Sequence, residues 1–363
     1  MPLTGLSLNR DILEAAVAGG SFYGGGGGGA SSIGLEMGNL ALSLGDPRLI
    51  SIDDIPGDSI LVTASAVGAP AAAGRHAKAY HYLKAVDLLI EYSGVSVYGF
   101  ISNECGGLAS VNGWVQAAAF GLPIVDAACN GRAHPTGAMG SMGLHLKPGY
   151  VSLQVGVGGS EERGTYIEVF ARGGIERASN MIRHAAVQAG GLVAVARNPV
   201  EASYVKKHGA PGAIGRCVEV GRAMLDAAGK SPGAAVEAAA DAAGGGVVCA
   251  GEVLRKDIET TGGFDVGRVE IEAGYDLVFW NEYMTLEKSG ERLATFPDLI
   301  ATLDADTGFP LSSAEVQAGQ RVAVVVVPKD SLILGAGVKD KGLYSAIERI
   351  TGKDVIKYAF DEG

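Results

Sequence analysis

Several features that would assign a chain to a common class of protein are missing from this sequence. It has only four cysteines in 363 residues, and no C-x-x-C pair among them, so we predict no disulfide framework, zinc ribbon or dithiol redox motif. No window approaches the roughly eighteen consecutive apolar residues of a membrane span. The first twenty residues lack the basic segment and apolar core of a signal peptide. We therefore expect a reducing, cytoplasmic setting.

Positive charge is also scarce. Lys and Arg total 29 against 40 Asp and Glu, which gives a net charge of -11, and no basic run offsets it. This balance disfavours binding to nucleic acid or to an anionic membrane. We therefore expect a small-molecule partner, and the glycine-rich apolar composition is compatible with a homo-oligomer.

Glycine, in contrast, is abundant, with 56 residues. Six of these occupy positions 24–29, between helices predicted at 7–18 and 31–44. Such a run exposes backbone N–H groups beside the positive end of a helix dipole, which suits a carboxylate or phosphate. The run has neither nucleotide-binding glycine pattern, so we predict no nucleotide. The candidate binding residues are Gly25, Gly26, Gly27 and Gly28; the alternative is a flexible loop.

Strand and helix patterns alternate between residues 48 and 126. Short strands are predicted at 48–52, 59–64, 95–101 and 123–126, and helices at 76–92 and 108–120. This order implies a parallel sheet with helices on its faces, and ligands of such sheets gather at the carboxyl ends of the strands.

The second half of the chain is richer in strand patterns, with two or three covering helices. The segment 251–274 has the alternation and central glycine of a hairpin. We predict two domains: an N-terminal parallel-sheet α/β domain over residues 1–168, which carries the glycine loop and a Cys105/Cys129 site, and a β-rich α+β domain over residues 169–363.

Reactive side chains concentrate in residues 102–139, where two of the predicted parallel strands end. Cys105 and Cys129 each follow one of these strands. A free thiol is more often a small buried hydrophobe than a nucleophile, and we favour that interpretation for Cys217 and Cys249. At Cys105, however, the helix predicted to follow would lower the thiol pKa and favour the thiolate.

Three other side chains of this segment suit acid–base chemistry. His134 follows Cys129 by five residues, and histidine is the commonest general base. Glu104 and Asp126 stand near strand ends, where a carboxylate can activate water, orient a base, or simply cap a turn or helix.

The segment also offers groups that could bind a substrate. Arg132 could hold a carboxylate through two parallel hydrogen bonds. Asn112 and the backbone N–H groups of Gly106 and Gly107 could contact a substrate and stabilise negative charge. The sequence has no zinc signature, although side chains far apart in the chain could still converge on a divalent metal such as zinc; the candidates are Cys105, Cys129 and His134.

An ordered set of longer motifs runs from about residue 9 to about residue 340. It comprises GSFYGGGGGGASSIG, VGAPAAAG, ECGG…N…AAAFGLPIVDA…NGRAHP, GGFDVGRVEIE, WNEYM, ATFPDLIATLD and TGFPL. No single motif is specific, but together they resemble the S-methyl-thiohydantoin desulfurase family, formerly a domain of unknown function, which often occurs beside or fused to hydantoinase and oxoprolinase proteins. Cys105, Cys129 and His134 depart from the usual family pattern.

The resemblance implies a substrate with a five-membered thiohydantoin ring, which is hydrolytically desulfurised to the hydantoin with release of hydrogen sulfide. A thiohydantoin propionate from ergothioneine breakdown would be one such substrate. In the mechanism we expect, the thiolate of Cys105, or else Cys129, adds to the thiocarbonyl carbon. Sulfide then leaves, and water attacks the adduct with His134 or Asp126 as the base.

Three alternatives stand beside this thiolate mechanism. Water could attack directly from a metal held by the cysteines and His134. The chain could instead be a ring-opening hydrolase of a hydantoin, lactam or oxoproline-like ring, in which the carboxylates act and the thiols do not. It could also be a non-catalytic ligand-binding subunit of a hydantoinase-like assembly.

Overall fold

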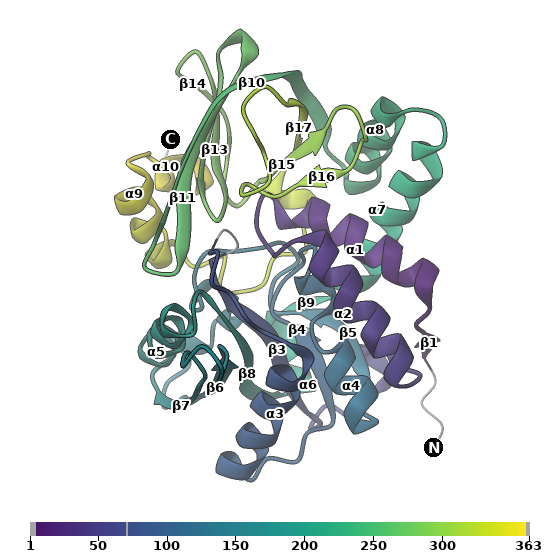
Figure 1. Cartoon of the computed structure of the whole chain (residues 1–363), viewed down its shortest axis with the longest axis vertical. Helices are drawn as coiled ribbons and strands as arrows, with labels where there is room; N and C mark the ends of the chain where they lie inside the picture. The colour runs from purple at the N-terminus through teal and green to yellow at the C-terminus, as the bar shows by residue number, and fades with distance from the viewer. Residues whose placement is uncertain (1–4, 70–71, 361–363) are drawn as a thin grey trace.

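Two β-sheets, each covered by helices, make up the computed structural model of the chain, which describes residues 5–69 and 72–360 (Figure 1). The first sheet lies in the lower half of the view and the second in the upper half. Within the described residues, no helix combines the length and the apolar composition needed to cross a membrane.

The first sheet contains the parallel strands that the sequence predicts. Its order is β1-β2-β5-β4-β3-β8-β6-β7, with β9 paired to β5. Strands β2, β5, β4 and β3 run parallel, and all other pairs are antiparallel. The strands are β1 (Leu6–Ser7), β2 (Arg48–Ser51), β3 (Ile60–Gly68), β4 (Gly99–Ser102), β5 (Ile124–Ala128), β6 (Ser152–Gly158), β7 (Ile167–Gly173), β8 (Leu192–Glu201) and β9 (Ala210–Pro211).

The second sheet is antiparallel throughout, in the order β14-β13-β12-β11-β10-β17-β15-β16. Its strands are β10 (Gly246–Thr261), β11 (Phe264–Ile271), β12 (Tyr275–Trp280), β13 (Glu282–Lys288), β14 (Glu291–Thr295), β15 (Leu299–Asp304), β16 (Pro310–Leu311) and β17 (Arg321–Val327). The predicted hairpin is β10–β11. The predicted fold class, a parallel-sheet α/β part and a β-rich part, is therefore confirmed.

The helices pack on both sheets, and α1 also contacts β15 and β16 of the second sheet. They are α1 (Arg10–Gly24), α2 (Ser31–Leu44), α3 (Ala79–Ser93), α4 (Trp114–Phe120), α5 (Ile175–Gln188), α6 (Ala202–His208), α7 (Ala213–Ala228), α8 (Pro232–Ala243), α9 (Ser345–Thr351) and α10 (Ile356–Ala359). Short 3-10 helices are η1 (Ile52–Asp54), η2 (Ala109–Val111), η3 (Met139–Ser141), η4 (Leu144–Leu146), η5 (Glu272–Gly274), η6 (Lys329–Ser331) and η7 (Lys341–Leu343).

Helix α1 is longer than the sequence pattern predicts, because its glycines serve a helix–helix contact. It begins after Asn9, whose side chain accepts a hydrogen bond from the Ile12 N–H at 2.9 Å, as expected of a capping residue. A Cβ added to Gly19 would lie 1.9 Å from the Cys217 carbonyl oxygen on α7. Glycine at position 19 therefore allows close packing rather than ending the helix.

The boundary that we predicted at residues 168/169 does not coincide with the boundary between the sheets. Strands β8 and β9 follow this point in the chain but belong to the first sheet, and β8 pairs directly with β3. The first sheet is completed only near residue 211.

Candidate active site

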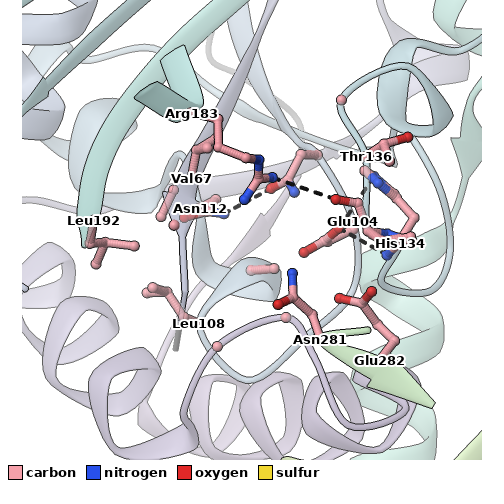
Figure 2. Close-up of a pocket in the computed structure, with 18 of the residues that line it drawn as sticks. Val67, Glu104, Leu108, Asn112, His134, Thr136, Arg183, Leu192, Asn281 and Glu282 are labelled. Atoms are coloured by element: carbon pink, nitrogen blue, oxygen red, sulfur yellow. Dashed lines mark hydrogen bonds and ion pairs between the residues drawn. The ribbon is translucent and has the colours of Figure 1, made fainter. Parts of the chain in front are cut away.

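A cleft opens where the parallel strands of the first sheet end, facing the turn between β12 and β13 (Figure 2). Its volume, including the part open to solvent, is about 830 Å³. Its polar and charged lining residues are Arg75, Asn103, Glu104, Asn112, His134, Thr136, Arg183, Arg197, Asn281 and Glu282. The carboxyl edge of the sheet, where the sequence predicts ligand binding, thus forms one wall.

Glu104 and His134 meet on that wall, and Figure 2 shows them side by side. Glu104 follows β4 in a turn fixed by Ser102, whose hydroxyl accepts from the Glu104 N–H at 3.3 Å and donates to the Ala109 carbonyl at 2.6 Å. Glu104 Oε2 lies 3.2 Å from His134 Nε2 and accepts a hydrogen bond from the His134 backbone N–H at 3.3 Å.

Burial sets the protonation of this pair. Glu104 is 9% exposed and His134 is 7% exposed. Loss of solvation raises the pKa of Glu104 to about 7, against weaker opposing effects of the His134 N–H and Arg197. Loss of solvation, with the charge of Arg197, lowers the pKa of His134 to about 3. At neutral pH the imidazole is therefore uncharged, and Glu104 can accept or donate a proton.

A second buried carboxyl group, that of Glu282, enters the cleft from the second sheet, at the start of β13. Asn281 precedes it at the β12–β13 turn with φ 57° and accepts a hydrogen bond from the Asp265 N–H at 2.9 Å, which fixes the turn. Burial and the neighbouring Glu104 raise the pKa of Glu282 well above its usual range. Among the described residues its Oε2 atom has no hydrogen-bond partner, so Glu282 is suited to hold a proton and donate it.

Two of the three arginines that line the cleft, Arg183 and Arg197, stand on regular secondary structure. Arg197 stands on β8 and is only 4% exposed. Arg183 stands on α5, where it donates to the Gly263 carbonyl at 2.6 Å and stacks 3.7 Å from the centre of the Phe264 ring. Sequence reasoning missed both residues. The sequence could have indicated Arg197, because it follows Val193 and Val195 on the same face of a strand, and that face is otherwise apolar.

Asn112, predicted to bind substrate, does line the cleft. Its Nδ2 donates to Asn103 Oδ1 at 3.0 Å, while within the described part of the chain its buried Oδ1 atom has no partner. A free buried acceptor of this kind suits an N–H donor on a ligand, such as a ring amide.

The glycine run forms a close backbone junction as well as part of the cleft. Gly28 lines the cleft, and its carbonyl accepts from the N–H groups of Leu108 and Ala109 at 3.1 and 3.0 Å. A Cβ at Gly28 would lie 2.4 Å from the Gly106 Cα atom. Gly106 therefore packs against the loop instead of presenting its N–H to a ligand.

The other glycines of the predicted binding set do not line the cleft. A Cβ at Gly27 would lie 2.1 Å from Glu282 Oε1, so this glycine makes room for the carboxyl group. Gly25 and Gly26 pack against the second sheet, and their carbonyls accept from the N–H groups of Tyr283 and Ser313. The remaining candidate, Gly107, packs against α2.

The two cysteines that we expected in the site lie outside it. Neither Cys105 nor Cys129 lines the cleft, and both are buried. The Cys105 thiol lies 3.7 Å from the Ala213 carbonyl oxygen, and Cys129 Sγ lies 3.4 Å from Thr63 Oγ1. A hydrogen bond with Cys217, followed by burial, raises the pKa of Cys105 well above its usual range, and burial raises that of Cys129 to about 11.

The helix expected to activate Cys105 does not begin beside it. The predicted helix 108–120 is split into η2 and α4 at Gly113, which has φ 92°. The expected lowering of the thiol pKa is therefore replaced by a rise. The structure gives no support to a thiolate that faces the cleft.

Asp126 and Arg132 also have structural partners rather than a place in the cleft. Asp126 Oδ1 accepts from the Ile214 and Gly215 N–H groups, both at 3.0 Å, at the start of α7. Arg132 is fully buried and donates to the carbonyl oxygens of Ala133, Pro297 and Asp298.

The suggested metal ligands do not converge. Cys105 faces α7, Cys129 faces β3, and His134 faces Glu104. In the described ranges, no three His, Cys, Asp or Glu side chains are grouped as metal ligands. These residues therefore do not fit a zinc ion, and we derive no step through one.

Comparison with known protein families finds two domain models that match the chain. The model described as "S-Me-THD-like, N-terminal domain" matches residues 11–161, and "S-Me-THD-like, C-terminal domain" matches residues 174–336. The chain belongs to the S-Me-THD-like family. The family resemblance inferred from the motifs is thus confirmed, and family membership fits action on a thiohydantoin.

A solved structure shares the fold of this family member. The crystal structure of a protein from Chromobacterium violaceum, determined by a structural genomics consortium, is 20% identical and matches with a TM-score of 0.69. The match covers 95% of this chain and 97% of the other. No curated protein matches the chain.

Proposed function

We propose that the chain is a hydrolase that converts a 2-thiohydantoin to the hydantoin and releases hydrogen sulfide. One observation carries the proposal: polar atoms that are buried and unpartnered within the described residues gather in the cleft beside Glu104 and His134. They are Asn112 Oδ1, Arg197 Nε, Glu282 Oε2 and both ring nitrogens of His134. Buried polar groups without partners mark a place where a polar ligand completes the hydrogen bonding.

A thiohydantoin ring matches these groups by its chemistry. Its ring N–H is a donor for Asn112 Oδ1, and its flat, partly apolar faces suit Val67 and Leu108 on the cleft wall. The thiocarbonyl sulfur accepts negative charge during addition to the ring carbon, and Arg197 supplies a buried cation for that charge.

In the proposed first step, water adds to the thiocarbonyl carbon while Glu104 accepts one of its protons. The backbone N–H of His134 holds the Glu104 carboxylate in place, and the neutral imidazole lies against it. The electron pair of the carbon–sulfur double bond moves to sulfur, next to Arg197, and a tetrahedral intermediate forms.

In the second step, the carbon–sulfur bond breaks. Protonated Glu282 gives its proton to sulfur, and then recovers a proton from the new hydroxyl group as the carbon–oxygen double bond forms. Hydrosulfide leaves with the bonding electron pair, and Glu104 then gives its proton to solvent, so that hydrosulfide and a proton, together hydrogen sulfide, are released. One water is consumed and one hydrogen sulfide is released, and both carboxyl groups regain their starting states.

We prefer direct attack by water to a covalent cysteine adduct because of where the two thiols lie. An attacking thiolate must reach the ring carbon, whereas Cys105 and Cys129 are buried behind the cleft wall with raised pKa values. Glu104 already lies in the cleft with a pKa close to neutral.

Incubation of purified protein with unsubstituted 2-thiohydantoin tests the proposal. We expect sulfide and hydantoin in equal amounts, with a loss of at least about a hundredfold in rate for Glu104→Gln. The matched control is Glu36→Gln, which removes an exposed carboxylate on α2. A ring-opened product without sulfide would support the ring-opening alternative and contradict the proposal. A ligand that binds and stays unchanged would contradict both enzymatic proposals.

A further inference from the structure

A second hollow adjoins the cleft on the far side of its arginines. It lies between α5, the second sheet and α9, and its lining includes Ser179, Phe264, Trp280 and Arg349. It shares Val67, Thr136, Gly137, Arg183 and Arg197 with the cleft. The two arginines therefore stand in a common wall, where a ligand can contact them from either side.

Arg197 is the unusual member of this wall. It is more than nine-tenths buried, and within the described residues no carboxylate lies at ion-pair distance from it. Its Nε atom has no hydrogen-bond partner in the same part of the chain. A buried cation without a counter-charge is costly, because its loss of hydration is not compensated.

The nearest charged side chain on the same wall adds to this positive charge. Arg183 has its own partners, the Gly263 carbonyl and the Phe264 ring, but these do not neutralise it. The electrostatic influence of Arg197 reaches Arg183 and helps to lower the Arg183 pKa. Glu104 lies on the cleft side and changes charge near neutral pH, so it is not a permanent counter-ion.

We propose that Arg197 is the centre of a binding site for a small, weakly hydrated monovalent anion, and that the second hollow is the exit for the hydrosulfide product. The assignment to hydrosulfide rests on the proposed function; the anion site does not. Guanidinium is weakly hydrated, and Val67, Phe264 and Trp280 supply apolar side chains to a lining that also includes the exposed carboxylate of Glu176. Such a site favours anions that lose their water easily over strongly hydrated ones such as sulfate or a carboxylate.

The reaction supplies an anion at this place. The carbon–sulfur bond breaks with its electron pair on sulfur, so hydrosulfide forms beside Arg197 while Glu104 still holds the proton taken from water. Departure into the second hollow takes the product away from the ring carbon and leaves the mouth of the cleft to the ring. Separate paths would let hydrosulfide leave before the hydantoin does.

Calorimetric titration of the whole, substrate-free protein with sodium thiocyanate tests the site, with acetate and sulfate compared at equal ionic strength. We expect one thiocyanate per chain, at least tenfold weaker binding in Arg197→Gln, and wild-type binding in Arg349→Gln. Arg349 is an exposed arginine of the same hollow, so its replacement controls for a general loss of positive charge. Equal binding by Arg197→Gln, or tighter binding of acetate than of thiocyanate, would overturn the proposal.

Crystals of the wild-type protein soaked in bromide provide a test that does not depend on the folding of a variant. An anomalous peak beside the Arg197 guanidinium supports the site, and its absence overturns it. The sulfide assay separates the two proposals: sulfide release without anion binding removes only the exit site. Anion binding without sulfide release supports the anion site and contradicts the proposed function.

Discussion

Glu104 and His134 lie 3.2 Å apart, yet they do not form an ion pair at neutral pH. Burial holds the pKa of the imidazole near 3, so that the ring is neutral, and holds the carboxyl pKa near 7. The His134 backbone N–H orients the carboxyl group, and the neutral imidazole beside it does not stabilise the carboxylate charge as an imidazolium would. The pair therefore keeps a carboxylate basic enough to take a proton from water.

The pH profile should show this directly. We expect kcat/KM for sulfide release to rise with pH through about 7, because Glu104 must lose its proton to act as a base. Rate measurements between pH 5 and 9 on wild type check this. A profile that is flat across pH 7, or that falls as pH rises, would exclude Glu104 as the base.

The raised pKa of Glu104 also affects stability. As pH rises, it lowers the free energy of unfolding, whereas it raises the rate of the reaction. The folded state keeps the Glu104 proton over the range from about 4.5, the ordinary value, to about 7. The unfolded state releases the proton across that window, so this group makes the free energy of unfolding fall as pH rises. Glu104→Gln should remove that slope, and urea unfolding at several pH values in both proteins measures it.

Replacing His134 should lower the rate without weakening substrate binding. For His134→Asn we expect kcat to fall about a hundredfold while KM changes less than threefold, because the imidazole contacts Glu104 rather than the ring. His184→Asn, an exposed histidine on α5, is the control. A rise in KM with unchanged kcat would instead place His134 in substrate binding.

The cysteines separate the water mechanism from the thiolate mechanism. Cys105→Ala and Cys129→Ala should each keep at least half of the wild-type rate of sulfide release. Each should lower the free energy of unfolding by about 1 to 2 kcal/mol, because a buried sulfur atom is removed from a packed site. Loss of all activity in a folded Cys105→Ala or Cys129→Ala protein would restore the covalent route.

The close contact between Gly28 and Gly106 can be tested with a matched glycine elsewhere. Gly28 has φ 72° and Gly94 has φ 67°, but an added Cβ has no neighbour within 4 Å at Gly94 and lies 2.4 Å from the Gly106 Cα at Gly28. We expect Gly94→Ala to cost about 1 to 2 kcal/mol and Gly28→Ala to cost more and also raise KM. Thermal and urea unfolding measure both variants. If Gly28→Ala and Gly94→Ala lower the free energy of unfolding equally, the contact between Gly28 and Gly106 tolerates displacement and the prediction is wrong.

Local sequence patterns predict the part of the site that follows the parallel strands. The alternation of strands and helices places Glu104 and His134 at one edge of the sheet, and the structure brings them into contact. Local sequence patterns do not predict whether Cys105, next to Glu104, faces the cleft or the core. That choice depends on Ala213 and Cys217 of α7, more than a hundred residues later.

The remaining site residues depend on how distant elements are placed in space. Glu282 reaches the cleft only because the β12–β13 turn of the second sheet packs over the glycine loop, where the Tyr283 N–H donates to the Gly25 carbonyl. Arg197 depends on the antiparallel addition of β8 beside β3. Neither the placement of Glu282 nor that of Arg197 follows from local periodicity. The sequence does show that Glu282 belongs to a polar pair after an apolar strand, and that Arg197 lies within an apolar strand.

The insertion of β8 between β3 and β6 joins the two family domains through one sheet. A chain that ended at residue 168 would contain β3 and β6 but not the strand that joins them. The edge of β3 would then be open to pairing with other chains, and the cleft would lack its buried arginine. During synthesis the cleft can therefore be completed only after β8 has been made, because β8 supplies part of its wall.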